Sequence, residues 1–233
     1  MKISNNYPLI KKYKKISQIV LYASLVLLVI GLVWSFTGAD ITQYTMAYAI
    51  LIPAYLLVQI SIYLANKWGR SPRPDEIIEQ SLKGLNDQYT LYNYNAGVPH
   101  LLVGPAGILI IKPYHQFGTI SFNSDKNRYE QQGGANFIAK LFGQEGLTDI
   151  LRESKIALRD FDAFNKKKNN SIDVKPRIVN IFYSDKADIL AKNAPEATIH
   201  SDKLKDMVRS QAKISQLRDE KINQIRQQLP DPN

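Results

Sequence analysis

The sequence predicts a mixed α/β fold that is preceded by two membrane-spanning helices. Two long uncharged apolar runs occur within the first 70 residues. They are followed by several short apolar segments separated by turn residues, and then by segments with helical periodicity. Helices and short strands in this order are typical of a mixed central sheet flanked by helices. The roughly 160 residues after the apolar runs are enough to bury a core.

The membrane module is predicted over residues 1–70. Ile16–Phe36 and Tyr44–Ala65 are runs of 21 and 22 residues without a charged side chain. Each is long enough to cross a hydrocarbon core about 30 Å thick as a helix. A cleaved signal peptide has a shorter apolar core of about 7–15 residues, so two spans are favoured over one anchor followed by a buried core helix. Small residues seven positions apart would let the helices pack closely: Ser24 and Gly31 in the first, Ala47 and Ala54 in the second.

Basic residues on the flanks predict the orientation. The segment 37–43 between the spans carries only Asp40, whereas both outer flanks are basic. These flanking residues are Lys2, Lys11, Lys12, Lys14, Lys15, Lys67, Arg70 and Arg73. Because short basic flanks stay in the cytoplasm, we expect a multi-pass protein of the cell membrane with both termini and the soluble domain cytoplasmic. Its expected partners are the lipid bilayer and anionic lipid headgroups.

Composition excludes several classes of protein. The 233 residues contain no cysteine, which excludes disulfides, thiolate nucleophiles and cysteine-ligated metals. The net charge of +9 alone suggests nucleic acid or an anionic membrane as a partner. However, residues 1–70 hold seven basic residues and one acidic residue, which leaves 23 basic and 20 acidic residues beyond them. The soluble part therefore has a net charge of only +3, which is smaller than the basic excess that dedicated nucleic-acid binders usually show.

The soluble domain is predicted to begin after a stiff linker at 71–74, where two prolines disfavour helix. Its α/β domain is predicted over residues 75–210, followed by a polar helix and tail over 211–233. We expect a helix first, then a meander of three or four strands joined by tight turns, one of which is Gly104-Pro105-Ala106-Gly107. The expected elements are a helix at 75–85 and strands at 89–94, 99–103, 108–111 and 119–122.

The second half of the domain alternates helices and strands. Apolar residues from Leu147 to Phe164 recur at helical spacing, in a helix that ends at Lys166, Lys167 and Lys168. These lysines either complement the helix dipole or form a phosphate-binding or lipid-binding patch. Strands are expected at 177–183 and 197–200, and helices from Ser201 through Val208 and over 212–229.

One stretch of the sequence resembles a known family. The segment from His100 to Ile111 (HLLVGPAGILII), with Gly118-Thr119-Ile120 after it, resembles the nuclease-related domain NERD, a relative of the PD-(D/E)XK nucleases. The resemblance implies a restriction-endonuclease-like domain with a core of one helix, three strands, a helix and a strand. It also implies a metal site formed by an acid before the His and an acid ending the second strand, with a Lys two positions further on.

The residues at those implied positions are different in this chain. Pro99 and Lys112 replace the two acids, and Tyr114 replaces the catalytic Lys. No Asp or Glu occurs from Gln88 to Ser124, so a shift of the alignment does not restore the motif. Since Mg²⁺ needs oxygen ligands, we expect no metal, no cofactor and no catalytic residue.

Three hypotheses follow. The first is a membrane-anchored, catalytically inactive NERD-like protein with a cytoplasmic binding or assembly role, in which Lys112, Tyr114 and His115 form either a basic pocket or an ordinary strand end. The second is nucleic-acid binding along lysines 166–168 with Lys175 and Arg177. The third is an active enzyme, such as a Mg²⁺-dependent nuclease with relocated ligands including Glu79.

Overall fold

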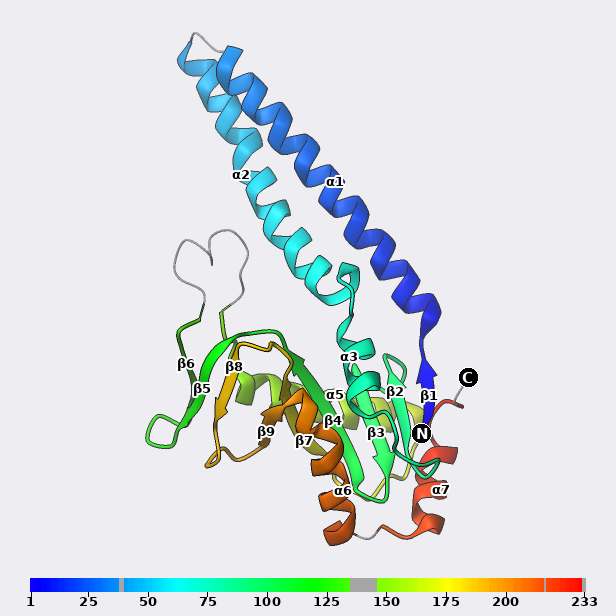
Figure 1. Cartoon of the computed structure of the whole chain (residues 1–233). Coiled ribbons are helices and arrows are strands. Elements are labelled where there is room, and N and C mark those ends of the chain that lie inside the picture. The colour runs from blue at the N-terminus through cyan, green and yellow to red at the C-terminus, as the bar shows by residue number, and fades with distance from the viewer. Residues whose placement is uncertain (38–39, 135–145, 216, 232–233) are drawn as a thin grey trace. The chain divides into compact units, whose positions relative to one another are not determined.

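The computed structural model describes residues 1–37, 40–134, 146–215 and 217–231. The chain forms two compact units, which we describe separately (Figure 1). One unit is the helical hairpin Tyr7–Arg73, and the other is an α/β domain made of Met1–Asn6 and Pro74–Asn233.

The hairpin consists of two long helices, α1 (Tyr7–Thr37) and α2 (Ile41–Leu64), and a π-helical turn over Ala65–Gly69. Both helices are long and apolar enough to cross a membrane. α1 begins well before the predicted span, because the lysine-rich segment that precedes Ile16 is also helical.

Burial in the hairpin is the inverse of that in a soluble helix pair. Apart from Ile10, the buried residues of the two helices are small, whereas most of the large apolar side chains are exposed or half-buried. The buried positions are Ile10, Ser17, Ser24 and Gly31 in α1, and Ala47, Ala54 and Ser61 in α2. A Cβ atom added to Gly31 would lie 2.8 Å from Leu51 Cδ2, so the helices pack closely there. The predicted contact through Ser24, Gly31, Ala47 and Ala54 is confirmed, and the outward apolar surface suits a lipid environment.

The α/β domain is built on a six-stranded mixed sheet in the order β1-β2-β3-β4-β7-β9 (Figure 1). β2, β3 and β4 form the antiparallel meander, and β4, β7 and β9 are mutually parallel. The strands are β1 (Lys2–Asn5), β2 (Thr90–Asn93), β3 (His100–Gly104), β4 (Gly107–Tyr114), β7 (Arg177–Phe182) and β9 (Ala197–His200). Gly107 in the turn between β3 and β4 has a φ of 95°, a conformation that favours glycine.

A second, three-stranded sheet follows β4 in the order β6-β5-β8. Its strands are β5 (Gly118–Asn123), β6 (Arg128–Gln132) and β8 (Ala187–Leu190). The sequence predicts β5 but neither β6 nor β8, because β6 is largely polar and β8 has only four residues.

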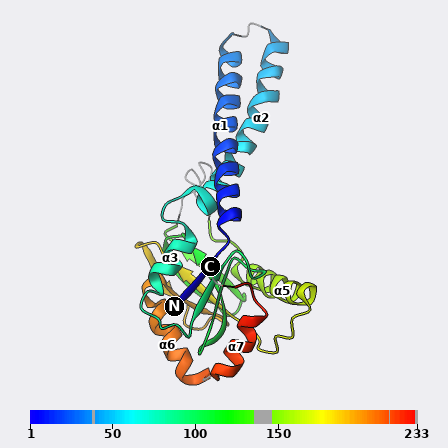
Figure 2. The same ribbon diagram turned by 90° about the vertical axis from the view of Figure 1, so that its right-hand side faces the viewer.

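Helices cover both faces of the main sheet (Figure 2). These are α3 (Pro74–Ser81), α5 (Ile150–Lys168), α6 (Leu204–Ser215) and α7 (Asp219–Gln227). α3 and α6 pack on one face around Ile78 and Val208, and α5 and α7 pack on the other around Phe161 and Ile225. The alternation of side chains along each strand divides its residues between these two cores. The expected mixed α/β architecture with helices on both faces is thus confirmed.

Two expectations about the ends of the domain differ from the structure. The predicted helix over 212–229 is divided, because Ala212 belongs to the end of α6 and α7 begins only at Asp219.

At the other end of the chain, the first residues form a strand of the α/β domain, whereas the sequence predicts them only as a flank of the first span. β1 pairs in parallel with β2, with Lys2 opposite Thr90 and Asn5 opposite Asn93. In the sequence, the helical hairpin is therefore inserted between the first strand of the α/β domain and the rest of that domain.

Candidate functional site

The three parallel strands β4, β7 and β9 end at the same edge of the main sheet. Their register places Lys112 opposite Asn180, and Asn180 opposite Thr198. Directly opposed residues lie on the same face of a sheet, so these three polar side chains form a row beside α5. The carboxyl ends of parallel strands are the usual place for ligands in α/β sheets. This row is the candidate functional site.

Lys112 forms an ion pair with a carboxylate from α5. Its Nζ lies 2.8 Å from Glu153 Oε2, and the Tyr114 hydroxyl donates to the same oxygen at 3.1 Å. Lys112 and Tyr114 reach one carboxylate because positions i and i+2 of a strand point to one face. The Lys112 side chain is 14% exposed and that of Glu153 is 38% exposed, so the pair lies at the edge of the core.

A second glutamate completes the site. Glu196, just before β9, accepts hydrogen bonds at Oε2 from Ser154 Oγ at 2.7 Å and from Asn180 Nδ2 at 2.8 Å. Asn180 is fully buried, and its Oδ1 has no hydrogen-bond partner among the described residues. Next to this group, the Tyr129 hydroxyl lies 2.8 Å from Thr198 Oγ1. We call Lys112, Tyr114, Glu153, Ser154, Asn180 and Glu196 the Lys112 cluster.

Burial and the surrounding charges shift the pKa values in this cluster. Burial lowers the pKa of Lys112, and its hydrogen bond and attraction to Glu153 offset only part of that effect. Burial alone would raise the pKa of Glu153, but hydrogen bonds from Lys112 and Thr148 and the Lys112 charge hold it below the ordinary value. Burial raises the pKa of Tyr114 strongly, and the adjacent Glu153 charge raises it further, so its hydroxyl stays protonated as a donor.

The structure brings only some of the predicted site residues together. Lys112 and Tyr114 converge on Glu153, while Pro99 is an exposed residue just outside β3 whose carbonyl accepts the Tyr94 amide at 2.7 Å. His115 follows β4 and is half-buried.

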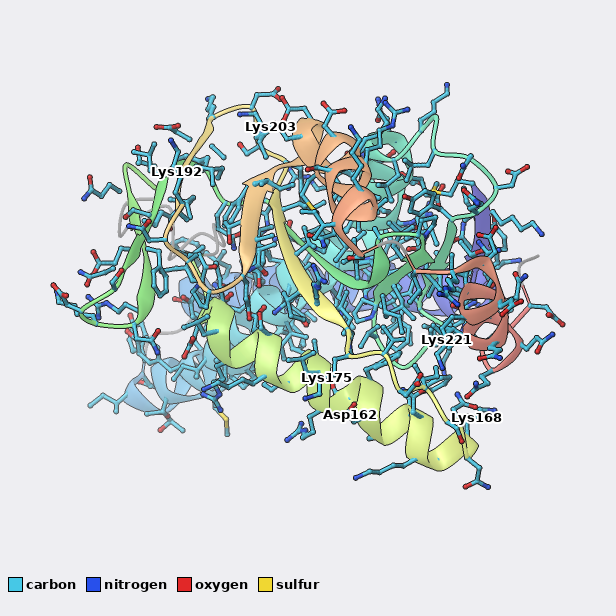
Figure 3. All side chains as sticks on the ribbon, turned by 90° about the horizontal axis from the view of Figure 1, so that it is seen from below. Asp162, Lys168, Lys175, Lys192, Lys203 and Lys221 are labelled. Atoms are coloured by element: carbon cyan, nitrogen blue, oxygen red, sulfur yellow. The ribbon has the colours of Figure 1, made fainter. Side chains whose placement is uncertain are left out.

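The three lysines at 166–168 lie apart from the cluster. They are exposed in the last turn of α5, and Lys168 marks that end of the helix in Figure 3. Glu153 lies in the first turn of the same helix. At a rise of about 1.5 Å per residue the two ends are roughly 20 Å apart. Lys112 and these lysines therefore do not form one basic surface.

Sequence reasoning missed the two acids of the cluster. Glu153 is 41 positions from Lys112, and Glu196 is 16 positions from Asn180. One signal was present, since Glu153 falls in the first turn of a predicted helix whose apolar face had to pack on the strand that contains Lys112.

A second buried polar network lies on the opposite face of the sheet. Asn93 Nδ2 donates to Asn5 Oδ1 at 2.8 Å and to Glu79 Oε1 at 3.0 Å, and Asn5 Nδ2 donates to the same Glu79 oxygen at 3.0 Å. Asn93 Oδ1 lies 2.8 Å from His100 Nδ1, which must be the donor because the amide oxygen only accepts. Glu79 is thus part of a network that joins β1, which precedes the hairpin in the sequence, to α3 and β2, which follow it.

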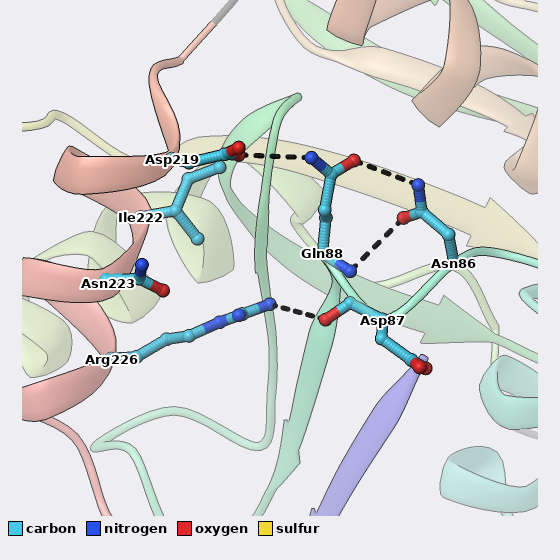
Figure 4. Close-up of a pocket in the computed structure, with 7 residues that line it drawn as sticks. All are labelled: Asn86, Asp87, Gln88, Asp219, Ile222, Asn223 and Arg226. Atoms are coloured by element: carbon cyan, nitrogen blue, oxygen red, sulfur yellow. Dashed lines mark hydrogen bonds between the residues drawn. The ribbon is translucent and has the colours of Figure 1, made fainter.

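A polar pocket of about 330 Å³ lies between the loop at 86–88 and α7 (Figure 4). Gln88 Nε2 donates to Asp219 Oδ1 at 3.1 Å, and Arg226 Nη2 donates to the Asp87 carbonyl at 3.3 Å. Arg226 Nε is buried without a partner among the described residues. The remaining lining residues are Asn86, Ile222 and Asn223. The mixture of amides, acids and one guanidinium does not select one class of ligand.

No family model, curated protein or solved structure matches the chain. The class that the molecule itself defines is therefore a mixed α/β domain attached to two helices long and apolar enough to span a membrane.

The residues at the implied nuclease positions do not fit a divalent metal. The side chain of Pro99 offers no donor atom, and Lys112 carries a positive charge that would repel the ion. In the described parts of the chain, no group of three or more His, Asp or Glu side chains is arranged to hold a metal.

Proposed function

We propose that this chain is a membrane-anchored, catalytically inactive relative of the NERD nucleases, with a binding or assembly role at the cytoplasmic surface of the cell membrane. The observation that carries the proposal is the Lys112–Glu153 ion pair of 2.8 Å. At the strand position where the resemblance implies a metal-binding acid, this chain has an ammonium group that is paired with a carboxylate.

The order of elements supports the nuclease-related origin. A helix (α3) precedes an antiparallel meander of three strands, and a second helix (α5) leads to a strand (β7) parallel to the last strand of the meander. This is the helix, three strands, helix, strand core that the resemblance implies. The fold alone does not supply the activity, because the chemistry of a site depends on its side chains.

The position of β1 supports the proposed membrane topology. β1 precedes the hairpin and the rest of the domain follows it, yet both belong to one sheet. The two segments must therefore be on the same side of the membrane, which an even number of spans provides. The basic flanks favour the cytoplasm for that side.

A cleavage assay tests the proposed loss of activity. Purified full-length protein in detergent is incubated with plasmid and Mg²⁺ or Mn²⁺, beside Glu153→Gln, Glu79→Gln and the exposed control Glu220→Gln. We expect intact plasmid with all four proteins. Metal-dependent cleavage by the wild type that is lost in Glu153→Gln or Glu79→Gln, but kept in Glu220→Gln, would overturn the proposal.

Nucleic-acid binding without cleavage is the second candidate, favoured by the exposure of three consecutive lysines at 166–168. If this surface binds phosphates, replacing the three lysines by glutamine should weaken DNA binding and reduce its salt dependence. Absence of DNA binding by the wild type at low salt excludes this candidate.

A further inference from the structure

We propose that one end of the helical hairpin is a binding site for anionic phospholipids. The site is formed by six exposed or half-buried basic residues, which we call the basic belt: Lys11, Lys12, Lys14, Lys15, Lys67 and Arg70. This inference rests on the proposed function, because it requires that the hairpin crosses a membrane. It goes further in assigning the residues that bind the lipid and in selecting anionic over zwitterionic headgroups.

A stack of two aromatic rings joins the two parts of the basic belt. The ring centroids of Tyr13 in α1 and Trp68 in the π-helical turn lie 4.9 Å apart, with an angle of 15° between the ring planes. Lys67 Nζ lies 5.6 Å from the centroid of the Trp68 ring, a distance typical of a cation–π contact. A Cβ atom added to Gly69 would lie 3.2 Å from Ser17 Oγ, so the turn packs closely on α1. The basic residues of α1 and of the turn therefore lie at the same end of the hairpin.

The hairpin holds almost no negative charge to neutralise the basic belt. Asp40 is the only acidic residue in the segment 7–73, and it caps the start of α2 at the other end of the hairpin. From Lys15 to the end of α1 at Thr37 the helix extends by about 33 Å, at about 1.5 Å per residue. Lys11 and Lys15 are one helical turn apart, where like charges repel each other. An anion bound from outside the hairpin would relieve this repulsion.

The position of the lysines along α1 matches the depth of lipid headgroups. Lys11–Lys15 directly precede the uncharged run that begins at Ile16, and they cover about 6 Å of helix. The headgroup layer is roughly 5–8 Å thick on each side of the hydrocarbon core. Tyr and Trp, the residue types of the aromatic stack, are also enriched at this depth. Clusters of about four to eight Lys and Arg residues directly outside a span are typical of sites for anionic lipids.

The surface next to the lysines favours a lipid over a soluble anion. Lys12, Lys15, Ile19, Tyr22 and Val26 are spaced by three or four residues, so they share one face of α1. All five are exposed. This face thus changes within one turn from ammonium groups to large apolar side chains. A ligand that matches both parts has an anionic head and an apolar chain, as a phospholipid does.

Quenching of tryptophan fluorescence by lipids tests the inference. The chain has two tryptophans, Trp68 beside the basic belt and Trp34 near the other end of α1. The full-length Trp34→Phe variant, which keeps Trp68, is reconstituted into vesicles of phosphatidylcholine and phosphatidylglycerol. Either lipid carries brominated acyl chains, which quench a nearby tryptophan. The two quenching curves give the binding constant of phosphatidylglycerol relative to phosphatidylcholine near Trp68.

Two multiple variants in the Trp34→Phe background separate the basic belt from the overall charge. The belt variant replaces the lysines at 11, 12, 14 and 15 by glutamine. The control variant replaces four exposed lysines of the α/β domain by glutamine and so removes the same charge: Lys155, Lys192, Lys203 and Lys213. The separate Trp68→Phe variant keeps Trp34 and reports on the opposite end of the hairpin.

We expect phosphatidylglycerol to bind near Trp68 at least about fivefold more tightly than phosphatidylcholine, both in Trp34→Phe and in the control variant. The preference should fall below about twofold in the belt variant. It should also fall below about twofold in Trp34→Phe at about 1 M NaCl, because salt screens the lysine charges. Near Trp34 we expect no preference for phosphatidylglycerol, since the turn beside it carries only Asp40.

Three results would overturn the inference. One is equal binding of the two lipids near Trp68, and another is a loss of preference as large in the control variant as in the belt variant. If the belt variant does not fold, the salt dependence of Trp34→Phe decides, and a preference unchanged at about 1 M NaCl is the third. Each failure leaves the proposed function in place if the chain enters the vesicles and the wild type does not cleave plasmid. A chain that stays outside the vesicles, or plasmid cleavage by the wild type, refutes the proposed function by a separate measurement.

Discussion

Asn93 is the residue whose replacement most directly tests how the first strand is held in the α/β domain. Its buried amide makes three hydrogen bonds, to Asn5, Glu79 and His100, with lengths of 2.8, 3.0 and 2.8 Å. In Asn93→Ala, Asn5 and Glu79 each lose a donor and His100 loses its acceptor. A buried group that loses its partner costs about 1–3 kcal/mol. Because Asn5 and Glu79 still contact each other, we count two losses and expect destabilisation of about 2–6 kcal/mol.

The cost should be concentrated at β1. This strand pairs with a single neighbour, β2, and Asn5 is its last residue. Native-state amide hydrogen exchange reports the free energy of local opening, and the amides of β1 should exchange much faster in the variant. β7, in the middle of the parallel part of the sheet, should change less.

Asn86→Ala is the matched control. Asn86 is an exposed asparagine whose side chain, among the described residues, bonds to Gln88 alone, so its removal should change stability by less than about 0.5 kcal/mol. Unchanged exchange at β1 in Asn93→Ala, or an equal effect of Asn86→Ala, would refute the role assigned to this network.

Two further changes test the Lys112 cluster and the hairpin. The pKa of Glu153 lies below 4.5 in the folded protein, so its contribution to stability is present above about pH 4.5 and is lost as the pH falls through the lowered value. Glu153→Gln should cost about 1–2 kcal/mol at neutral pH, allowing for partial exposure, and should flatten the acid limb of a pH-dependent unfolding curve; an unchanged acid limb would contradict this. In the hairpin, Gly31→Leu places side-chain atoms where Leu51 lies and should destabilise the helix pair by about 1–3 kcal/mol in a detergent unfolding titration, whereas the outward-facing control Val29→Leu should not; equal stability of the two variants would argue against the close contact.

Much of the architecture could be predicted because local patterns determine it. The uncharged runs identify α1 and α2, and the turn around Gly107 identifies the pairing of β3 with β4. The helical periodicity of Leu147–Phe164 identifies α5 and its apolar face. In each case neighbouring residues alone carry the signal.

The remaining features depend on contacts between residues far apart in the sequence. β1 has only four residues and is recognisable as a strand only through its pairing with residues 90–93. The candidate site has the same origin, because Lys112 was identified from its strand but its partner Glu153 comes from a helix 41 positions later. The position of Lys112 at the end of a strand could thus be found in the sequence, whereas the carboxylate that pairs with it could not.

Single-cysteine labelling tests most directly the central claim that one α/β domain, including β1, lies on one side of a membrane crossed by the hairpin. The chain has no cysteine, so Lys2→Cys, Asp40→Cys and Asp125→Cys each provide one labelling site at an exposed position. With a membrane-impermeant maleimide, we predict labelling at 40 in intact cells, and labelling at 2 and 125 only after the membrane is permeabilised. Labelling at 2 and 125 on opposite sides, or at 40 and 125 on the same side, would contradict the account.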